Sequence, residues 1–272
     1  MSSSAVNFSH STSLLGHLPS LPISLLSCFI LQAFSRHILS PGLFPSYYNN
    51  LSKFTKFNWD TRVVAWVHAF YATFIALWVL VIHPNRFQSI HNDKLFGYHH
   101  HAMNLLSVSA GYFLWDVIVS LKMTLNGQGV GFLVHAVCCF VAFFFSRVFA
   151  GYFGFAFLLW EASTIFLNPH WFFDKVGMTG SKLQIYNGIV LLASFFFSRL
   201  VYGNYVSYQL VMSTLQDGVR QKAGARLLNT ILTLDFLLSA LNIYWFYQMI
   251  TSVRKRFQPA SKLRKKPTAK SL

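Results

Sequence analysis

The chain has 272 residues, of which 54% are hydrophobic and only 11% are charged. With a mean hydropathy of +0.45, it lacks the polar surface that a soluble domain of this size needs, which excludes a soluble globular protein. The net charge of +15 does not indicate a nucleic-acid-binding protein, because eight basic residues follow the last apolar run without any acidic residue. A basic flank of this kind is typical of a cytosolic tail that contacts anionic lipid headgroups.

Long apolar runs joined by short polar segments predict an all-α fold, a polytopic transmembrane helical bundle of about seven spans. A helix needs about 20 predominantly apolar residues to cross the hydrocarbon core. The candidate spans are 20–39, 62–83, 103–122, 130–147, 149–171, 183–212 and 227–252. The first is the weakest because it contains Gln32 and Arg36. The short joint at 147–149 predicts that the fourth and fifth spans form a helical hairpin.

The distribution of basic residues predicts an orientation for this bundle. With the N-terminus in the lumen, 14 basic residues fall on the cytosolic side and 6 on the luminal side, as the positive-inside rule requires. We therefore expect a disordered luminal N-terminus (1–19), a first transmembrane helix with its cytosolic loop (20–54), a main membrane domain (55–255) and a basic disordered cytosolic tail (256–272). Asn7 heads a luminal glycosylation sequon, Asn7-Phe8-Ser9.

Five ionisable side chains lie within the predicted spans, where each costs about 2.5–3.5 kcal/mol or more and is therefore the default place to seek function. They are Asp116, His135, Glu161, Arg199 and Asp235. Further polar residues recur near them at helical spacing, so each of these helices has one polar face. Such faces predict a shared polar interior.

Counting residues from the span ends places Asp116, His135 and Glu161 in the cytosolic half of the bundle, where they form a hypothetical catalytic cluster. Arg199 lies deeper, and Glu161–Arg199 is the expected buried ion pair. Asp235 lies nearer the lumen. The alternative is structural, because intramembrane polar residues also hold helices together by hydrogen bonds. We favour that reading for Arg199 and Asp235, and leave both open for the other three.

Nothing in the sequence predicts a metal or cofactor site. The run His99-His100-His101 attracts attention, but consecutive residues point in different directions and rarely converge on one ion. We interpret it as a luminal interfacial loop. Phosphate-binding loops, nucleophile elbows and zinc-protease helices are absent from the sequence.

Three stretches together resemble the TLC (TRAM–Lag–CLN) domain family over roughly residues 55–255. The most specific is 159–171, LWEASTIFLNPHW, in which Ile165 replaces the usual proline and His170 the usual arginine. The matching residues there are Glu161, Ser163, Thr164, Phe166, Asn168 and Trp171. The segment containing Gly111, Tyr112 and Asp116, and the segment ending at His135, are similar to two further motifs of this family in order and spacing.

The resemblance implies a helical bundle with a lipid-accessible cavity in the endoplasmic reticulum or another endomembrane, and a role in lipid homeostasis. The partner would be a sphingolipid, a fatty acyl chain or a phospholipid, bound or sensed without catalysis and without a cofactor. Asn168, Arg199, Asp235, Tyr112 and Trp171 would be cavity or structural polar residues.

Two alternatives stay open. The first is an N-acyltransferase similar to ceramide synthases, which would use acyl-CoA with His135 as the catalytic residue. Those enzymes have two adjacent histidines where this chain has His135-Ala136, which weighs against it. The second is a transporter, disfavoured because we find neither repeat symmetry nor paired broken spans.

Overall fold

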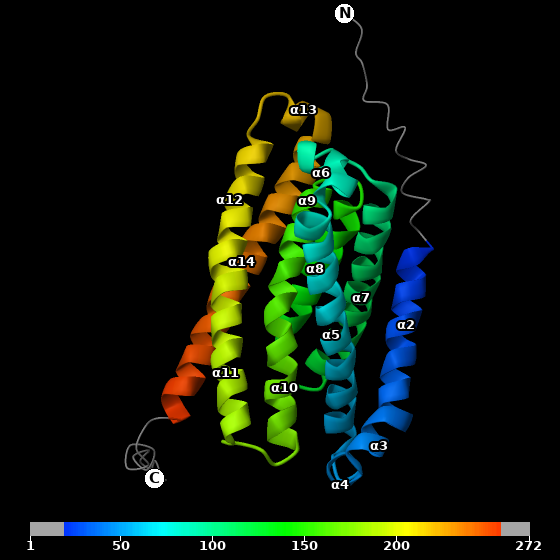
Figure 1. Ribbon diagram of the computed structural model, residues 1–272, viewed down its shortest axis with the longest axis vertical. Coiled ribbons are helices and arrows are strands. Elements are labelled where there is room, and N and C mark those ends of the chain that lie inside the picture. The colour runs from blue at the N-terminus through cyan, green and yellow to red at the C-terminus, as the bar shows by residue number, and fades with distance from the viewer. Residues whose placement is uncertain (1–18, 257–272) are drawn as a thin grey trace, which may run out of the picture.

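The computed structural model describes residues 19–256, and every regular element in that range is helical, which confirms the predicted all-α class (Figure 1). The predicted disorder of the N-terminus, the sequon at Asn7 and the tail beyond Arg256 lie outside the described residues. In chain order the elements are α2 (Ser20–Phe34), η1 (Ser35–Leu39), α3 (Ser40–Leu43), α4 (Pro45–Tyr48), α5 (Lys53–Leu77), η2 (Trp78–Ile82), η3 (Pro84–Phe87), α6 (Gln88–Asn92), α7 (His100–Leu125), α8 (Val130–Ser146), α9 (Gly151–Leu158), η4 (Leu159–Ser163), α10 (Thr164–Lys175), α11 (Lys182–Phe195), η5 (Phe196–Tyr202), α12 (Gly203–Thr214), α13 (Val219–Ala223) and α14 (Ala225–Arg256).

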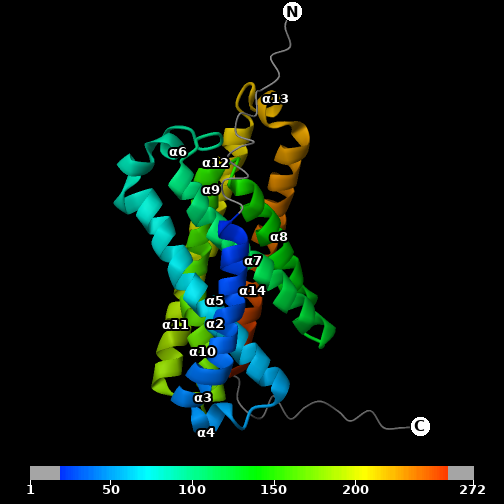
Figure 2. The ribbon, with the colours of Figure 1, turned by 90° about the vertical axis from the view of Figure 1, so that its right-hand side faces the viewer.

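Each of the seven predicted spans corresponds to helix. Five continuous helical stretches are long and apolar enough to cross a membrane, namely Ser20–Leu43, Lys53–Ile82, His100–Leu125, Lys182–Thr214 and Ala225–Arg254. The predicted fourth span is the shorter apolar helix α8, of 17 residues. The predicted fifth is α9, η4 and α10 in succession, with a 3-10 segment in the middle. Figures 1 and 2 show these segments running side by side along the long axis.

The two ends of the bundle are formed by different helix termini and connections. The end at which α14 finishes also holds the start of α5, the end of α7 and the connection between α10 and α11 (Figure 1). We call it the basic end, after Lys53, Lys122, Lys182 and Arg254. The opposite end holds the start of α2 and the connections between η2 and α7 and between α12 and α14.

Two helices begin earlier than their hydropathy suggests. The second predicted span starts at 62, but α5 begins at Lys53 because the Ser52 hydroxyl caps it, accepting from the Thr55 N–H at 3.2 Å. The predicted histidine loop is wrong for His100 and His101, which form the first turn of α7. His99 caps that helix through Nδ1, which accepts from the Ala102 N–H at 3.4 Å.

The predicted hairpin between the fourth and fifth spans is confirmed, but its arginine does not lie in a solvated turn. Ala150 takes the left-handed conformation at φ 59°, and its N–H donates to the Leu95 carbonyl at 2.6 Å. Arg147 has no exposed surface. Its Nε donates to the Phe144 carbonyl at 3.1 Å, so the cation folds back onto the C-terminus of α8, where the helix dipole favours it.

The first helix packs on α7 through small residues. In both views α2 lies alongside α7, and the Ser24 hydroxyl donates to the Val108 carbonyl at 2.6 Å (Figure 2). A Cβ at Gly111 would collide with the Leu21 carbonyl and the Ser24 side chain. Gln32, a residue that weakened the prediction of this span, accepts from the Trp115 indole N–H at 3.2 Å. This contact explains how α2 carries a polar residue.

Candidate functional site

Two departures from regular α-helix lie where the fifth and sixth spans meet. The 3-10 segment η4 carries Glu161 and Ser163, and the π-helical segment η5 carries Arg199. Mid-helix segments of both kinds recur at functional sites in proteins, because they redirect side chains that a regular helix would point elsewhere. The two segments face each other across a buried hydrogen-bond cluster.

Arg199 is the centre of this cluster, and the predicted Glu161–Arg199 ion pair is confirmed. Nη2 lies 3.4 Å from Glu161 Oε1 and 3.2 Å from Thr164 Oγ1. Nε donates to the Ser163 hydroxyl at 2.9 Å, and Nη1 donates to Asn242 Oδ1 on α14 at 3.1 Å. The guanidinium therefore joins three membrane-crossing segments, and both ends of the ion pair are buried.

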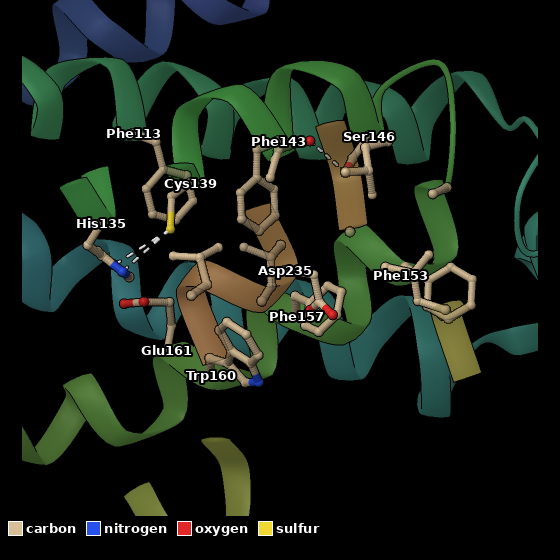
Figure 3. Close-up of a pocket in the computed structure, with 17 residues that line it drawn as sticks. Phe113, His135, Cys139, Phe143, Ser146, Phe153, Phe157, Trp160, Glu161 and Asp235 are labelled. Atoms are coloured by element: carbon tan, nitrogen blue, oxygen red, sulfur yellow. Dashed lines mark hydrogen bonds between the residues drawn. The ribbon is translucent and has the colours of Figure 1, made fainter. Parts of the chain in front are cut away.

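A cavity of about 50 Å³ lies directly beside this cluster, enclosed by α7, α8, α9, η4, α12 and α14 (Figure 3). Most of its walls are apolar. The apolar side chains are those of Phe113, Ala142, Phe143, Ala150, Phe153, Phe157, Leu158, Trp160, Leu210, Ile231 and Leu238. A space of this size admits a few water molecules or a short segment of a lipid, not a whole lipid.

Polar groups reach the cavity from three elements, α8, η4 and α14. His135 and Glu161 lie toward the same end, with the His135 ring beside the Cys139 thiol at 3.6 Å from Nε2 (Figure 3). The same ring packs edge-on against Trp245 of α14, with centroids 5.1 Å apart. Asp235 lines another part of the wall and accepts from the Ser207 hydroxyl at 2.8 Å.

The third member of the predicted catalytic cluster, Asp116, does not line this cavity. Asp116 accepts from the Ser120 hydroxyl one turn further along α7, at 3.3 Å, and is not among the residues that line the cavity. Tyr112 likewise lies outside the lining and stacks on His68, with ring centroids 3.5 Å apart and 8° between the planes. His135, Glu161 and Asp235 line one cavity, whereas Asp116 lies outside that lining but within electrostatic range of Glu161.

Asn168 and Trp171 both contact Arg62, nearer the basic end. Arg62 donates from Nη1 to Asn168 Oδ1 at 3.3 Å, and its guanidinium lies over the Trp171 ring at 4.7 Å. Arg62 is one of the 14 basic residues expected on the cytosolic side, at the predicted start of the second span. The cap at Ser52, followed by a helical first turn, is the signal that places Arg62 inside α5.

Sequence reasoning also missed Asp60, which is 1% exposed. Its Oδ1 accepts from the Ser35 hydroxyl at 2.8 Å, and its Oδ2 accepts from the Tyr48 hydroxyl at 2.9 Å. Burial, together with the hydrogen bond to Asp60, raises the pKa of Tyr48 well above its usual value, so the phenol stays protonated as a donor. This cluster closes the basic end around Trp59, whose indole N–H donates to the Ser40 hydroxyl at 2.9 Å.

Within residues 19–256, no three His, Cys, Asp or Glu side chains lie close enough together to hold a metal ion. His135, Cys139 and Glu161 offer a base, a thiol and a carboxylate in one cavity, which is chemistry suited to hydrogen bonding or acyl transfer.

Comparison with known proteins gives a consistent result. The family model described as the TLC domain (TRAM, LAG1 and CLN8) matches residues 58–251. An uncharacterised TLC domain-containing protein of Schizosaccharomyces pombe is 34% identical over 238 residues, covering 86% of this chain and 79% of that protein. Topoisomerase I damage affected protein 4 of Saccharomyces cerevisiae is 26% identical over 265 residues, covering 93% and 90%. TLC domain-containing protein 4 of Homo sapiens is 28% identical over 180 residues, covering 65% and 64%.

Proposed function

This chain belongs to the TLC domain family of membrane proteins, and on that premise we propose that it binds part of a membrane lipid in the cavity beside Glu161 and so influences lipid composition. The observation that carries the proposal is a largely apolar cavity inside the helical bundle, lined also by His135, Glu161 and Asp235.

The polar groups supply the selectivity. Hydrocarbon gains little by moving from a bilayer into an apolar protein cavity, because lipid tails are as apolar as leucine. Hydrogen bonds are different, since a lipid hydroxyl, amide or ester has few partners in the hydrocarbon region. A lipid that offers such a group to His135 or Asp235 would be preferred over one that offers only methylene groups.

The walls suggest a route for the rest of the lipid. Ala142 and Ser146 on α8, and Ile231 and Asp235 on α14, line the cavity and are only half-buried. These side chains therefore reach the surface of the bundle, which in a membrane contacts acyl chains. The small cavity then needs to hold only the polar group and its neighbouring methylenes, while the remaining chain stays in the bilayer.

A photo-crosslinking experiment tests the proposal. Cells expressing the protein are fed a palmitic acid analogue that carries a diazirine and an alkyne, and labelled peptides of the purified protein are mapped after irradiation. We expect labelling on α8 and α14 in the wild type, and strong loss in Ala142→Trp, which fills the cavity. Ala193→Trp, on the exposed face of α11, is the matched control and should keep the labelling. Equal labelling of both variants would refute the cavity as the binding site.

Acyl transfer from acyl-CoA is a second candidate, favoured by one observation: the His135 ring lies next to the Cys139 thiol within the same cavity. A base beside a nucleophile is the arrangement that acyl transfer requires. A deletion strain rescued with His135→Ala distinguishes the two functions. Full restoration of the lipid profile by His135→Ala excludes catalysis by His135, whereas an acylated product formed by purified wild type and not by the variant excludes a binding-only role.

A further inference from the structure

A second cavity, of about 260 Å³, lies at the basic end between α2, η1, α5 and α7. Arg36, His37 and Lys122 line it together with Phe29, Phe57 and Asp60. The three basic residues are exposed, so the cavity opens at the surface. We call it the basic cleft. Because Lys122 lies in the last turn of α7, the cleft is level with the ends of the helices, where a bilayer has its headgroups.

The acidic residue in the cleft does not neutralise the cations by direct contact. Both oxygens of Asp60 face buried hydroxyl groups, since Oδ1 accepts from Ser35 at 2.8 Å and the single Tyr48 O–H is shared between Oδ1 and Oδ2 at 3.0 and 2.9 Å. Within residues 19–256, neither Arg36 nor Lys122 forms an ion pair with this carboxylate. The cleft therefore presents two permanent cations and one imidazole beside a single carboxylate, which lies within electrostatic range of Arg36 and His37 without forming an ion pair with them.

The π-helical segment η1 arranges the groups in this way. Ser35 points inward, has no exposed surface and holds Asp60, whereas the next two residues, Arg36 and His37, line the cleft. Lys122 approaches from α7, with its Nζ 4.2 Å from the centre of the Phe57 ring. Cations supplied by separate helices suit an anion that several donors contact at once.

An apolar path leads away from the cleft along α2. Phe29, Ile30 and Phe34 are 38%, 60% and 43% exposed, so this helix leaves an apolar outer face beside the cations. A soluble anion would gain nothing from such a face. A phospholipid would, because its acyl chains lie along apolar helix surface while its phosphate sits at the helix ends.

We propose that the basic cleft binds the headgroup of an anionic phospholipid, with the phosphate held by Arg36 and Lys122 and the acyl chains along α2. This site is separate from the cavity beside Glu161, and its existence does not depend on the function proposed for that cavity.

Native mass spectrometry of the full chain in detergent tests this site. Phosphatidylserine and phosphatidylcholine with identical acyl chains are titrated against the wild type, the cleft variant Arg36→Gln/Lys122→Gln and the control variant Lys53→Gln/Lys182→Gln. The control removes two exposed lysines at the same end of the bundle but outside the cleft. All three proteins keep the basic tail, so any lipid binding by the tail is the same in each and does not affect the comparison.

We expect the cleft variant to bind phosphatidylserine about tenfold or more weakly than the wild type, since each basic residue near an anionic lipid contributes roughly fivefold. The control should change little, and phosphatidylcholine should bind weakly to all three proteins. Equal losses in both variants, or equal binding of the two lipids, would overturn the proposal. So would equally tight binding of glycerophosphoserine, which has the headgroup without acyl chains and would identify a site for soluble phosphates.

Because the replaced side chains are exposed, the variants should melt at the wild-type temperature in the same detergent. Lys122→Arg adds a second check, since it preserves the charge and should preserve the preference for phosphatidylserine. Loss of that preference in Lys122→Arg, with unchanged melting, would contradict charge recognition by the cleft.

Discussion

Arg199 is a cation at membrane depth, and each of its three guanidinium nitrogens donates to a neighbouring side chain. This explains how the bundle tolerates a charge that would otherwise be costly in hydrocarbon. The carboxylate of Glu161 and three neutral oxygens surround it, from two spans other than its own. The residue therefore fixes the relative position of the fifth, sixth and seventh spans beside the cavity.

Removing one partner of this pair should destabilise the protein strongly. We expect Arg199→Gln to lower the unfolding free energy by about 3–5 kcal/mol, because it leaves the Glu161 carboxylate buried without a counter-charge. Unfolding of the purified protein in detergent, followed by circular dichroism, measures the effect. The double variant Glu161→Gln/Arg199→Gln removes both charges and should recover part of the loss. An Arg199→Gln protein as stable as the wild type would show that the pair does not hold the spans together.

At the scale of elements, the packing of α2 on α7 depends on the absence of a side chain at Gly111. The backbone of α2 approaches so closely that a Cβ there would overlap the Leu21 carbonyl. Close approach at small residues is a common basis of helix association in membranes, where burial of apolar surface provides little drive. The first helix is thus a packed part of the bundle, even though the family model begins only at residue 58.

Gly111→Leu should separate α2 from the bundle, because no flexible side chain can move out of its way. The matched control is Gly131→Leu on α8, where a Cβ would meet nothing within 4 Å. Limited proteolysis within the connection between α4 and α5 reports on the packing, and we expect faster cleavage for Gly111→Leu alone. Similar cleavage of both variants would mean that α2 is not held by this contact.

For the whole molecule, the two ends of the bundle should lie on opposite sides of the membrane, with the basic end in the cytosol. The positive-inside rule gives the reason, because basic residues are retained on that side. The chain contains natural sequons on each side of the first helix, at Asn7 and at Asn50 in Asn50-Leu51-Ser52. Their glycosylation state therefore reports the orientation directly.

We expect a glycosidase-sensitive mobility shift that disappears in Asn7→Gln and persists in Asn50→Gln when the protein is expressed in a eukaryotic cell. Electrophoresis before and after enzymatic deglycosylation measures it. A shift that depends on Asn50 would reverse the orientation, placing the basic end in the lumen.

The sequence by itself determined the class of fold, the approximate spans and the Glu161–Arg199 pair. Apolar length and helical periodicity are local properties, and an isolated buried charge requires a partner of opposite sign at similar depth. The tertiary structure decided which polar residues meet. It joined His135, Glu161 and Asp235 at one cavity, left Asp116 with Ser120, and buried Asp60 and Arg147. The 3-10 and π-helical segments account for part of this, because they rotate Glu161 and Arg199 about the helix axis by amounts that regular periodicity does not predict. The rest follows from the packing of helices that are far apart in the sequence.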